Sequence, residues 1–596
     1  MLTCTRRAAT ALSACALLVI ACSDTSVGPP PADTFSFVGE VVELGTLHDV
    51  FVRAPDDIWA VGAHGLTIHY DGSLWHRVES GTGEALNGVW VAADGTAHAV
   101  GNHGVILRFN GTAWNPVTSP VIDNINAIHG ISGSNIFAAA DNGAVLHYNG
   151  SVWNRQQTNG VTEDLRDIWG YSPSVAFAVG DNGTLLSYTG ANWSTLAAVT
   201  GDDLRGVYGF SATDVFAVGN NGALLHFDGS AWSQQVSGVS GWLQALWGPS
   251  GDDVFAAGEA GTVLHYDGAA WTPFTSNIFT TQYMTGAGGT AGDDVIAVGS
   301  GGTVLRYDGA KWKKDLSDAG AVVRRGIWGT SRDDLFVVGT HGEVFHRGSN
   351  GWSFVAGGGY AASLNDVSGA GAHVFAVGDA GTALHGDGPS WTLMDTGTTA
   401  GLNGVWAASA ADVFAVGNDG TILHFDGSTW SPQTSGTNRV LHDVWGMSND
   451  DVFAVGNDGL VLHWDGSAWT QDAMLDAVAL HAVWGTSPSN LIVVGTGAGG
   501  QGNAFRRSGS QWKREEIGAT GSLECIHGVS ANDAFAAGIG GGGIGNFRDA
   551  FFHYDGESWQ PSSTNGYVHL TSVWATSAAT VFAAGTGTVV YHGTRR

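Results

Sequence analysis

Tryptophan recurs along this chain at a regular spacing, and this period restricts the possible fold more than any other feature. Thirteen tryptophans between residues 75 and 559 follow one another at intervals of 39 to 47 residues. A period of this size is typical of β-propeller blades or of solenoid units. The tryptophans that set it are Trp75, Trp114, Trp153, Trp193, Trp232, Trp271, Trp312, Trp352, Trp391, Trp430, Trp469, Trp512 and Trp559.

The repeated unit divides into four short runs that are rich in β-forming residues. In residues 402–439 the runs are LNGVW, DVFAVG, TILHF and STWSPQT, which we name strands A, B, C and D. Asn-Asp-Gly separates B from C and Asp-Gly separates C from D, and both are signals for tight hairpin turns. No segment offers ten or more residues with helical periodicity. The sequence therefore predicts an all-β fold of tandem β-propellers with about 14 four-stranded blades.

The composition agrees with this fold and excludes one class of partner. Glycine accounts for 91 of the 596 residues, which suits many tight turns, and 43% apolar residues suffice for a large core. The formal net charge is −30. Because binding to nucleic acid requires clustered Lys and Arg, we expect no nucleic-acid partner.

The amino terminus has the pattern of an export signal. Arg6 and Arg7 precede an uncharged apolar stretch that ends at Ala21. The sequence Val-Ile-Ala-Cys22 resembles a bacterial lipobox, which implies cleavage after residue 21 and lipidation of Cys22. Residues 22–34, with three consecutive prolines, are then a tether to the membrane. Ser23 is not the aspartate that retains enterobacterial lipoproteins at the inner membrane, so the resemblance favours the outer membrane.

The repeats resemble the bacterial propeller repeats grouped with WD-repeat, YVTN and BNR/Asp-box sequences, over roughly residues 35–596. Strings of the type GNDGTILHFDGSTW are also similar to repeats of photosystem II assembly-factor-like proteins. The spacing in Asp71-Gly-Ser-Leu-Trp75 is one residue tighter than in an Asp-box, and the Trp-Asp ending of WD repeats is absent. The resemblance therefore implies the fold rather than an activity.

Fourteen units exceed the usual ring of four to eight blades, so we expect two seven-bladed rings. Phe35 occupies a strand-D tryptophan slot, and the last unit stops after strand C. This phasing predicts a first propeller over residues 35–309 and a second over 310–596, each closed by strand exchange. A division into six and eight blades, or one very large ring, is the alternative. The orphan strand at Phe35 can also complete the final blade instead.

One polar position, just after the first apolar residue of strand A, changes from blade to blade. Strand A is innermost in a propeller, so we expect this position to surround the mouth of the central channel. Function in a repeat array is expected where the repeats differ, and unselected variation on a wet surface is the alternative interpretation. The candidate ligand-binding residues at this position are Arg166, Arg205, Arg325, His442, His481 and Glu524.

Two recurring features are expected to be structural. Ten units carry a histidine in strand C, as at His69 and His424, which we interpret as a hydrogen-bonding residue between blades. Acidic pairs such as Asp56-Asp57 precede strand B in several units. The carboxylate oxygens of these pairs could bind calcium. Hydrogen bonds from these side chains to the backbone of the turn explain the pairs more simply. We therefore predict no cofactor, with calcium as the alternative.

The enzyme motifs G-x-S-x-G and H-E-x-x-H do not occur in the sequence, and there is no cysteine cluster for a metal. Sialidases of the BNR group need three arginines in one ring, whereas Arg166 and Arg205 fall in the first ring and Arg325 in the second. His442, His481 and Glu524 come from three successive units and have the residue types of a two-histidine, one-carboxylate metal site. Enlarged B–C loops at residues 497–503 and 538–545 are expected to overhang them.

The hypothesis from the sequence is a lipid-anchored scaffold of the bacterial cell envelope, without catalytic activity. Its partner would be an envelope or extracellular protein or a polysaccharide, and it would contact the membrane through the lipid anchor only. A BNR-like glycan hydrolase or lyase is the alternative, and an assembly factor for another envelope protein is a third hypothesis.

Overall fold

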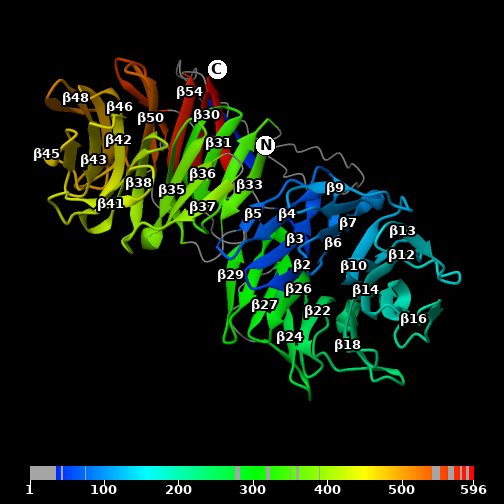
Figure 1. Ribbon diagram of the computed structural model, residues 1–596. Helices are drawn as coiled ribbons and strands as arrows, with labels where there is room; N and C mark the ends of the chain where they lie inside the picture. The colour runs from blue at the N-terminus through cyan, green and yellow to red at the C-terminus, as the bar shows by residue number, and fades with distance from the viewer. Residues whose placement is uncertain are drawn as a thin grey trace, which may run out of the picture.

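The computed structural model describes residues 35–41, 45–73, 75–274, 282–316, 323–349, 351–357, 362–387, 390–539, 551–561, 569–577, 580–585 and 589–595. Within these ranges the strands pair into twelve four-stranded antiparallel sheets and one sheet of eight strands. The eight-stranded sheet consists of two blades joined at their edges, so the described residues form fourteen blades arranged in two rings of seven (Figure 1). The predicted tandem propeller fold is confirmed.

A typical blade follows the repeat pattern strand by strand. It consists of β38 (Leu402–Ser409), β39 (Asp412–Gly417), β40 (Ile422–Phe425) and β41 (Trp430–Gln433). The last five residues of β39 are all buried, because this strand packs against neighbouring blades on both faces. A one-turn 3₁₀ segment joins β39 to β40, and Asp419 within it has a φ of 57°. Aspartate tolerates this left-handed conformation, which explains the repeated Asn-Asp-Gly signal.

The repeated tryptophans pack between blades, as the sequence indicates. Trp193 in strand D lies edge-to-face against Phe137 of the preceding blade, with ring centroids 6.0 Å apart. Trp406 in strand A lies against Gly446 of the next blade, where an added Cβ would stand 2.7 Å from the indole ring. The tryptophan and the small residue beside it are therefore one packing unit.

Ring one is built from one continuous stretch of chain. Its innermost strands follow one another around the channel, and the seventh packs beside the first to close the ring. These strands are β2 (Leu47–Ala54), β6 (Leu86–Val91), β10 (Ile125–Ser132), β14 (Leu165–Ser172), β18 (Leu204–Ser211), β22 (Leu243–Ser250) and β26 (Met284–Ala291).

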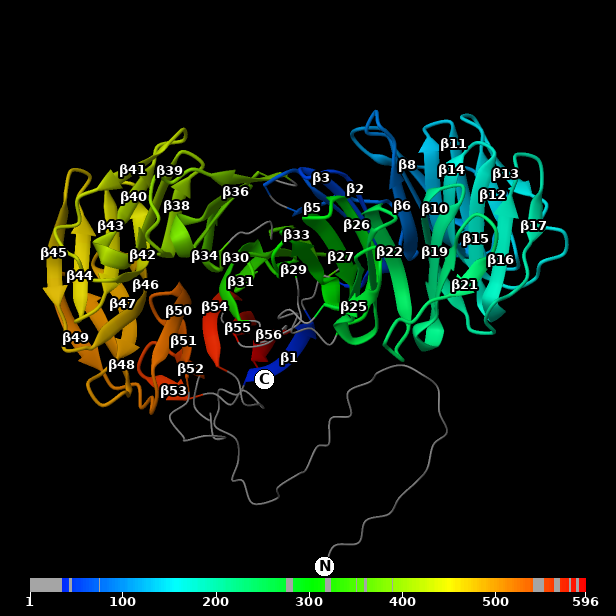
Figure 2. The same cartoon turned by 90° about the horizontal axis from the view of Figure 1, so that it is seen from below.

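Ring two has the same plan, and its seventh innermost strand packs beside its first. Its innermost strands are β30 (Arg324–Ser331), β34 (Leu364–Ala370), β38, β42 (Leu441–Ser448), β46 (Ala479–Ser487), β50 (Leu523–Ser530) and β54 (Leu570–Ser577). Figure 2 shows the two rings beside each other.

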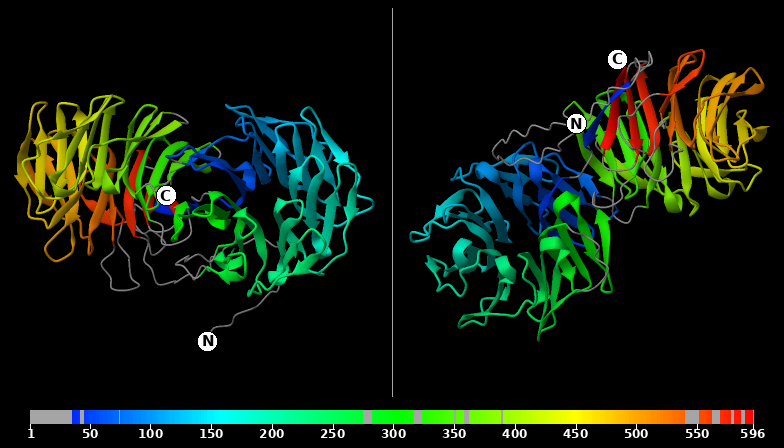
Figure 3. Two further views of the ribbon diagram at one scale, coloured as in Figure 1. Left: turned by 60° about the horizontal axis from the view of Figure 1, so that its bottom comes forward. Right: turned by 180° about the vertical axis from the view of Figure 1, so that it is seen from behind.

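The first strand of the chain belongs to ring two. β1 (Phe35–Val41) pairs antiparallel with β56 (Val589–Arg595), in register from Phe35 opposite Arg595 to Val41 opposite Val589. It is therefore the outer strand of the last blade, and Figure 3 shows it beside the C-terminal strands. The prediction that this strand closes the first ring is wrong. The alternative, in which it completes the final blade, is what the structure has.

The first ring also keeps its own last strand. β29 (Trp312–Leu316) pairs with β28 (Val304–Tyr307) and completes blade seven. The predicted division between residues 309 and 310 therefore falls inside that blade. Ring one needs no strand from elsewhere, and only ring two closes by strand exchange.

The two rings are joined by backbone pairing. β5 (Trp75–Arg77), the outer strand of blade one, pairs with β33 (Gly351–Gly357), the outer strand of the first blade of ring two. One hydrophobic cluster continues across this junction and includes Trp75 from ring one and Phe354 from ring two. The rings therefore share a core in addition to the linker between them.

Candidate functional site

Each ring encloses a cavity in its central channel. The cavity of ring one measures about 540 Å³ and that of ring two about 610 Å³, and the innermost strands line both. Strand A begins at the end of the channel where the B–C turn also lies, because the first residue of strand A pairs with the last residue of strand B, as Leu402 does with Gly417. We call this end the mouth of the ring.

The six candidate residues line the channels near their mouths. Arg166 and Arg205 contribute to the cavity of ring one. Arg325, His442, His481 and Glu524 contribute to the cavity of ring two. The variable position therefore lies where its place in strand A indicates.

This variable position has a structural task that the sequence analysis missed. Asn126 donates from Nδ2 to the backbone carbonyl of Leu165 on the next blade, at 2.8 Å, and to Asp141 Oδ1 on its own blade, also at 2.8 Å. Asn126 thus links two blades by hydrogen bonds. The need for this link restricts which residues can occupy the position. The corresponding bonds to a carbonyl on the neighbouring blade are made by His48, Asn87, Asn365, Asn403, Thr285 and Thr571.

Three candidates of ring two meet at its mouth. The imidazole rings of His442 and His481 have centroids 5.1 Å apart. His481 Nδ1 lies 3.8 Å from Glu524 Oε2, and the two side chains are 21% and 25% exposed. Burial lowers the pKa of His481, so its imidazole is mostly neutral near pH 7.

Hydrogen bonds from the end of strand B, the B–C turn and the residue before strand A hold these three side chains in place. His442 Nε2 bonds to Asn457 Oδ1 at 2.8 Å, and His481 Nε2 bonds to Thr496 Oγ1 at 3.0 Å. Ser522 donates to Glu524 Oε1 at 2.5 Å. Each side chain keeps further polar atoms for a ligand, so the mouth of ring two is a preorganised polar site.

The arginines do not join this group. Arg325 donates from Nη1 to Asn365 Oδ1 at 2.6 Å, on the side of the mouth away from the histidines. In ring one, Arg166 Nε and Nη2 both donate to Asp181, at 2.7 and 2.6 Å. This bond to Asp181 is the main cause that raises the pKa of Arg166. No ring brings three of these arginines together.

The residues that were considered as metal ligands are bonded to neighbouring side chains. Across the described part of the chain, no three His, Cys, Asp or Glu side chains are grouped so that they could hold a metal ion. The second aspartate of an acidic pair instead binds strand C, as Asp57 does with His69 Nε2 at 2.8 Å. Because both residues belong to one blade, the expectation that this histidine bridges two blades is wrong. The same bond recurs at His226–Asp214, His265–Asp253, His346–Asp334, His424–Asp412, His463–Asp451 and His553–Asp533.

Four buried carboxyl groups in the channels escaped the sequence analysis. They lie two residues after the start of strand A, where most blades have Gly or Ala. Asp167 accepts from the backbone N–H of Ile168 at 2.8 Å and from that of Val207 on the next blade at 2.7 Å. Burial raises the pKa of Asp167 to about 7 and that of Asp49 to about 6. Burial likewise raises the pKa values of Asp366 and Asp443 in ring two.

Another residue at the mouth of ring two was also missed. His569 immediately precedes strand A of the last blade, and burial lowers its pKa while the charge of Glu524 opposes that shift. Its identity departs from the small residues found there in most blades, and that departure could have marked it.

Of the two enlarged loops, one can be described. Residues 497–503 form a tight turn in which Gly497 N–H donates to the carbonyl of Gln501 at 2.7 Å. Asn503 is buried and is fixed by Arg514, which donates to its Oδ1 at 2.7 Å. In the second loop, residues 540–545 lie outside the described residues, as does Cys22. No helix in the described ranges is long and apolar enough to cross a membrane.

Neither a protein-family model nor a curated protein matches the sequence. Among solved structures, the chain is similar to YCF48 bound to a D1 peptide, with 17% identity over 46% of this chain and 96% of that chain, and a TM-score of 0.39. The WD40 β-propeller domain of Doa1 is 13% identical over 46% of this chain and 95% of that one, with a TM-score of 0.38. The GH74 enzyme of Niastella koreensis is 12% identical over 94% of this chain and 99% of that chain, with a TM-score of 0.40. At these identities the likeness concerns the fold alone.

Proposed function

We propose that this protein is a lipid-anchored binding scaffold of the bacterial cell envelope, which holds a protein or glycan at the mouth of ring two without transforming it. The observation that carries the proposal is the group formed by His442, His481 and Glu524. These side chains are partly exposed over a cavity of about 610 Å³ and are fixed by bonds to their own blades.

The chemistry of this group suits a neutral polar ligand. A neutral imidazole offers one donor and one acceptor, and the Glu524 carboxylate offers acceptors. The hydroxyl groups of a sugar and the amide groups of a peptide each offer both hydrogen-bond donors and hydrogen-bond acceptors. Because the side chains are already oriented in the free protein, little entropy is lost when the ligand binds.

The proposal is tested by replacing both His481 and Glu524 with alanine. We expect the double variant to lose binding to envelope polysaccharides on a glycan array and cross-linking to envelope proteins in intact cells. Its thermal unfolding should change little, because both side chains are partly exposed. The matched control is Asn87→Ala with Asn126→Ala at the same position in ring one, which should keep the binding. Unchanged binding by the His481/Glu524 variant would reject this mouth as the site.

The catalytic alternative is tested on the purified mature chain. We expect no turnover of glycans, lactones or peptides. Turnover that disappears in the His481→Ala variant would replace the scaffold by an enzyme. Recovery of one stoichiometric envelope protein from membranes would instead favour an assembly factor.

The anchoring part of the proposal is tested separately. Cys22→Ser should move the protein from the membrane fraction to the soluble fraction, because the lipobox cysteine would carry the acyl chains. Membrane recovery that persists at high salt in this variant would contradict lipidation.

A further inference from the structure

Ring one carries an aromatic pair at its mouth that ring two lacks. Trp242 and Tyr283 occupy the position just before strand A in blades six and seven. Their rings are stacked, with centroids 5.2 Å apart and an angle of 26° between the planes. Tyr283 is 46% exposed. The other twelve blades have Thr46, Ala85, Asn124, Asp164, Asp203, Val323, Ser363, Gly401, Val440, Ala479, Ser522 and His569 at this position.

A cation already lies against this pair. The guanidinium carbon of Arg205, from blade five, lies 5.1 Å from the centre of the Trp242 ring. Arg205 is held there by Asn220, whose Oδ1 accepts from Nε at 2.5 Å. The electron-rich face of an indole or phenol ring attracts a cation, and the attraction grows as water is excluded. Tyr283 is the more exposed ring of the pair, and its surface offers this interaction to a partner.

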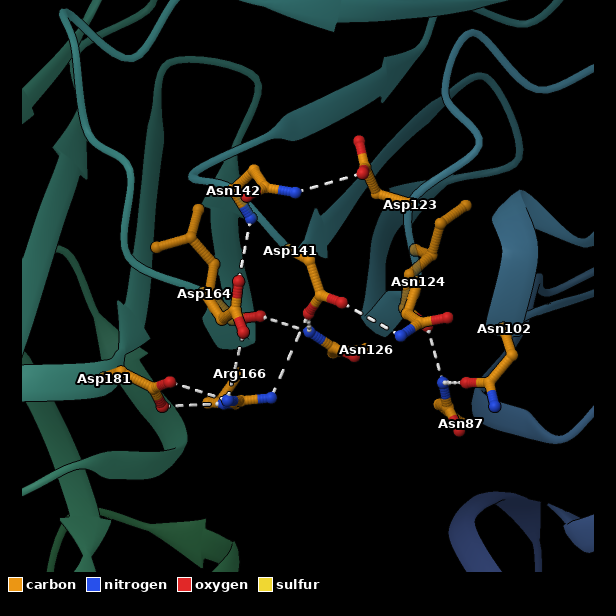
Figure 4. A network of polar contacts seen from close by, with 12 residues as sticks. Asn87, Asn102, Asp123, Asn124, Asn126, Asp141, Asn142, Asp164, Arg166 and Asp181 are labelled. Carbon is orange, nitrogen blue, oxygen red and sulfur yellow. Dashed lines mark hydrogen bonds and ion pairs between the residues drawn. The ribbon is translucent and has the colours of Figure 1, made fainter.

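The rest of this mouth carries an excess of negative charge. Figure 4 shows the carboxylates of blades three and four, where Arg166 is the cation that several of them share. Amide side chains complete this network, as when Asn142 Nδ2 donates to Asp123 Oδ1 at 3.0 Å. The carboxylates at the strand starts and B–C turns of ring one are Glu84, Asp123, Asp141, Glu163, Asp164, Asp181, Asp202, Asp203 and Glu259.

The mouth of ring two is different although the repeat is the same. At the corresponding positions it has the carboxylates Asp379, Asp419, Asp458 and Glu524, and it has two cations, Arg325 and Arg439. The two rings therefore present different charges and different surfaces.

We propose that the mouth of ring one docks a lysine- and arginine-rich segment of a partner protein. One cationic side chain would lie on Tyr283, and others would pair with the carboxylates of blades three to six. This site is separate from the one proposed in ring two, and neither requires the other. Charge complementarity would also speed the encounter, so the association should weaken as salt is added.

The test is fluorescence anisotropy of the mature chain with labelled peptides of equal length. The probes are an arginine-rich, a lysine-rich and a glutamate-rich peptide, with a neutral oligosaccharide as competitor. We expect the basic peptides to bind, the glutamate-rich peptide to fail, and affinity to fall at least tenfold in Trp242→Thr/Tyr283→Ser. This variant installs the residues that blades one and nine have at the same position.

Three further variants separate the site from the fold. Tyr283→Phe keeps the aromatic ring and should keep binding, whereas Asp202→Asn with Glu259→Gln should weaken binding and reduce its salt dependence. Ser363→Ala, at the equivalent position of ring two, is the matched control and should bind like wild type. Equal peptide binding by wild type and the Trp242/Tyr283 variant would overturn the proposal. Binding of the glutamate-rich peptide as tightly as the basic peptides would also overturn it. So would binding of the oligosaccharide more tightly than the basic peptides, if the Trp242/Tyr283 variant abolishes that binding.

Discussion

Arg324 is the clearest residue-scale departure from the repeat. It occupies the first apolar position of strand A, where other blades have Leu, Ile or Met, and it is fully buried. Its Nη1 lies 3.5 Å from Glu343 Oε1, and its guanidinium lies over Phe345. Glu343 occupies a position where several blades have Thr, so the two departures compensate each other. A buried ion pair adds little net stability compared with apolar residues, but it is costly to break.

We therefore expect a non-additive pair of substitutions. Arg324→Leu or Glu343→Thr alone should each lower the free energy of unfolding by about 3–5 kcal/mol, because the remaining buried charge loses the opposite charge of the other side chain. The double variant, which restores the common repeat residues, should unfold within about 2 kcal/mol of wild type. Urea unfolding of the four proteins measures this, and additive losses would contradict the compensation.

The buried channel carboxyl groups give stability a pH dependence of unusual sign. The pKa of Asp167 is about 7 in the folded protein, above the value of 3.8 that an unperturbed aspartate has. The folded state thus holds the proton more tightly than the unfolded chain. The contribution of this group to stability is full below about pH 4 and is lost as the pH rises from 4 to 7.

Asp167→Ala should flatten this profile. The slope of unfolding free energy against pH between 4 and 7 should change by at most about 1.4 kcal/mol per pH unit, the value for one proton. The lost hydrogen bonds to Ile168 and Val207 lower stability at every pH and leave the slope alone. Asp395→Ala, at an exposed position, is the control. An unchanged slope in Asp167→Ala would show that the carboxyl group stays ionised throughout.

At the scale of elements, one strand decides how ring two closes. β1 supplies the outer strand of the last blade, and without it β56 would present an unpaired edge. β29 supplies the same strand to ring one from within that ring. Changes near residue 35 should therefore affect the second ring and spare the first.

Deletion of residues 35–41 should loosen the last blade of ring two. Hydrogen exchange should rise in the last blade, in β54, β55 (Thr580–Gly585) and β56. It should stay unchanged in β2 to β29 of ring one. Removal of residues 589–595 should raise exchange in the same blade, because it takes away the pairing partner. Faster exchange in ring one after either deletion would contradict the observed pairing.

The sequence predicts the blades well because each one satisfies the same local rules. The fourfold strand pattern, the Asp-Gly turns and the inter-blade tryptophans all appear as expected. The strand at Phe35 was assigned to the wrong ring, since every blade edge in a repeat array is equivalent and spacing alone cannot choose between the rings. The channel carboxyl groups and the pair of Trp242 and Tyr283 are visible as departures from the repeat. Their environment depends on neighbouring blades, which a single unit does not reveal.

At the scale of the whole molecule, the junction between the rings is a continuous sheet. The backbone pairs His76 opposite Ala356 and Trp75 opposite Gly357. Trp75 is fully buried in a cluster that draws residues from both rings. The rings should therefore unfold as one cooperative unit, unlike domains that a linker alone connects.

Trp75→Ala should uncouple the two rings. We expect it to cost about 3–5 kcal/mol, as is usual when a buried Trp is truncated, and to split a single calorimetric transition into two. Trp153→Ala removes the same side chain from the same slot of blade three, away from the junction. It should cost a similar amount and retain one transition. Two transitions in both variants, or one in both, would contradict the coupling.

The pairing of β1 with β56 also gives the order of synthesis a consequence. Ring one can form as soon as residues 47–316 have been made, since all its strands lie within that stretch. Among the described strands β1 is made first, yet its partner at residues 589–595 is made last. A chain whose translation stops early thus retains an open sheet edge, the kind of structure that proteases and other unpaired strands engage. Ring two can therefore close only after residues 589–595 have been made.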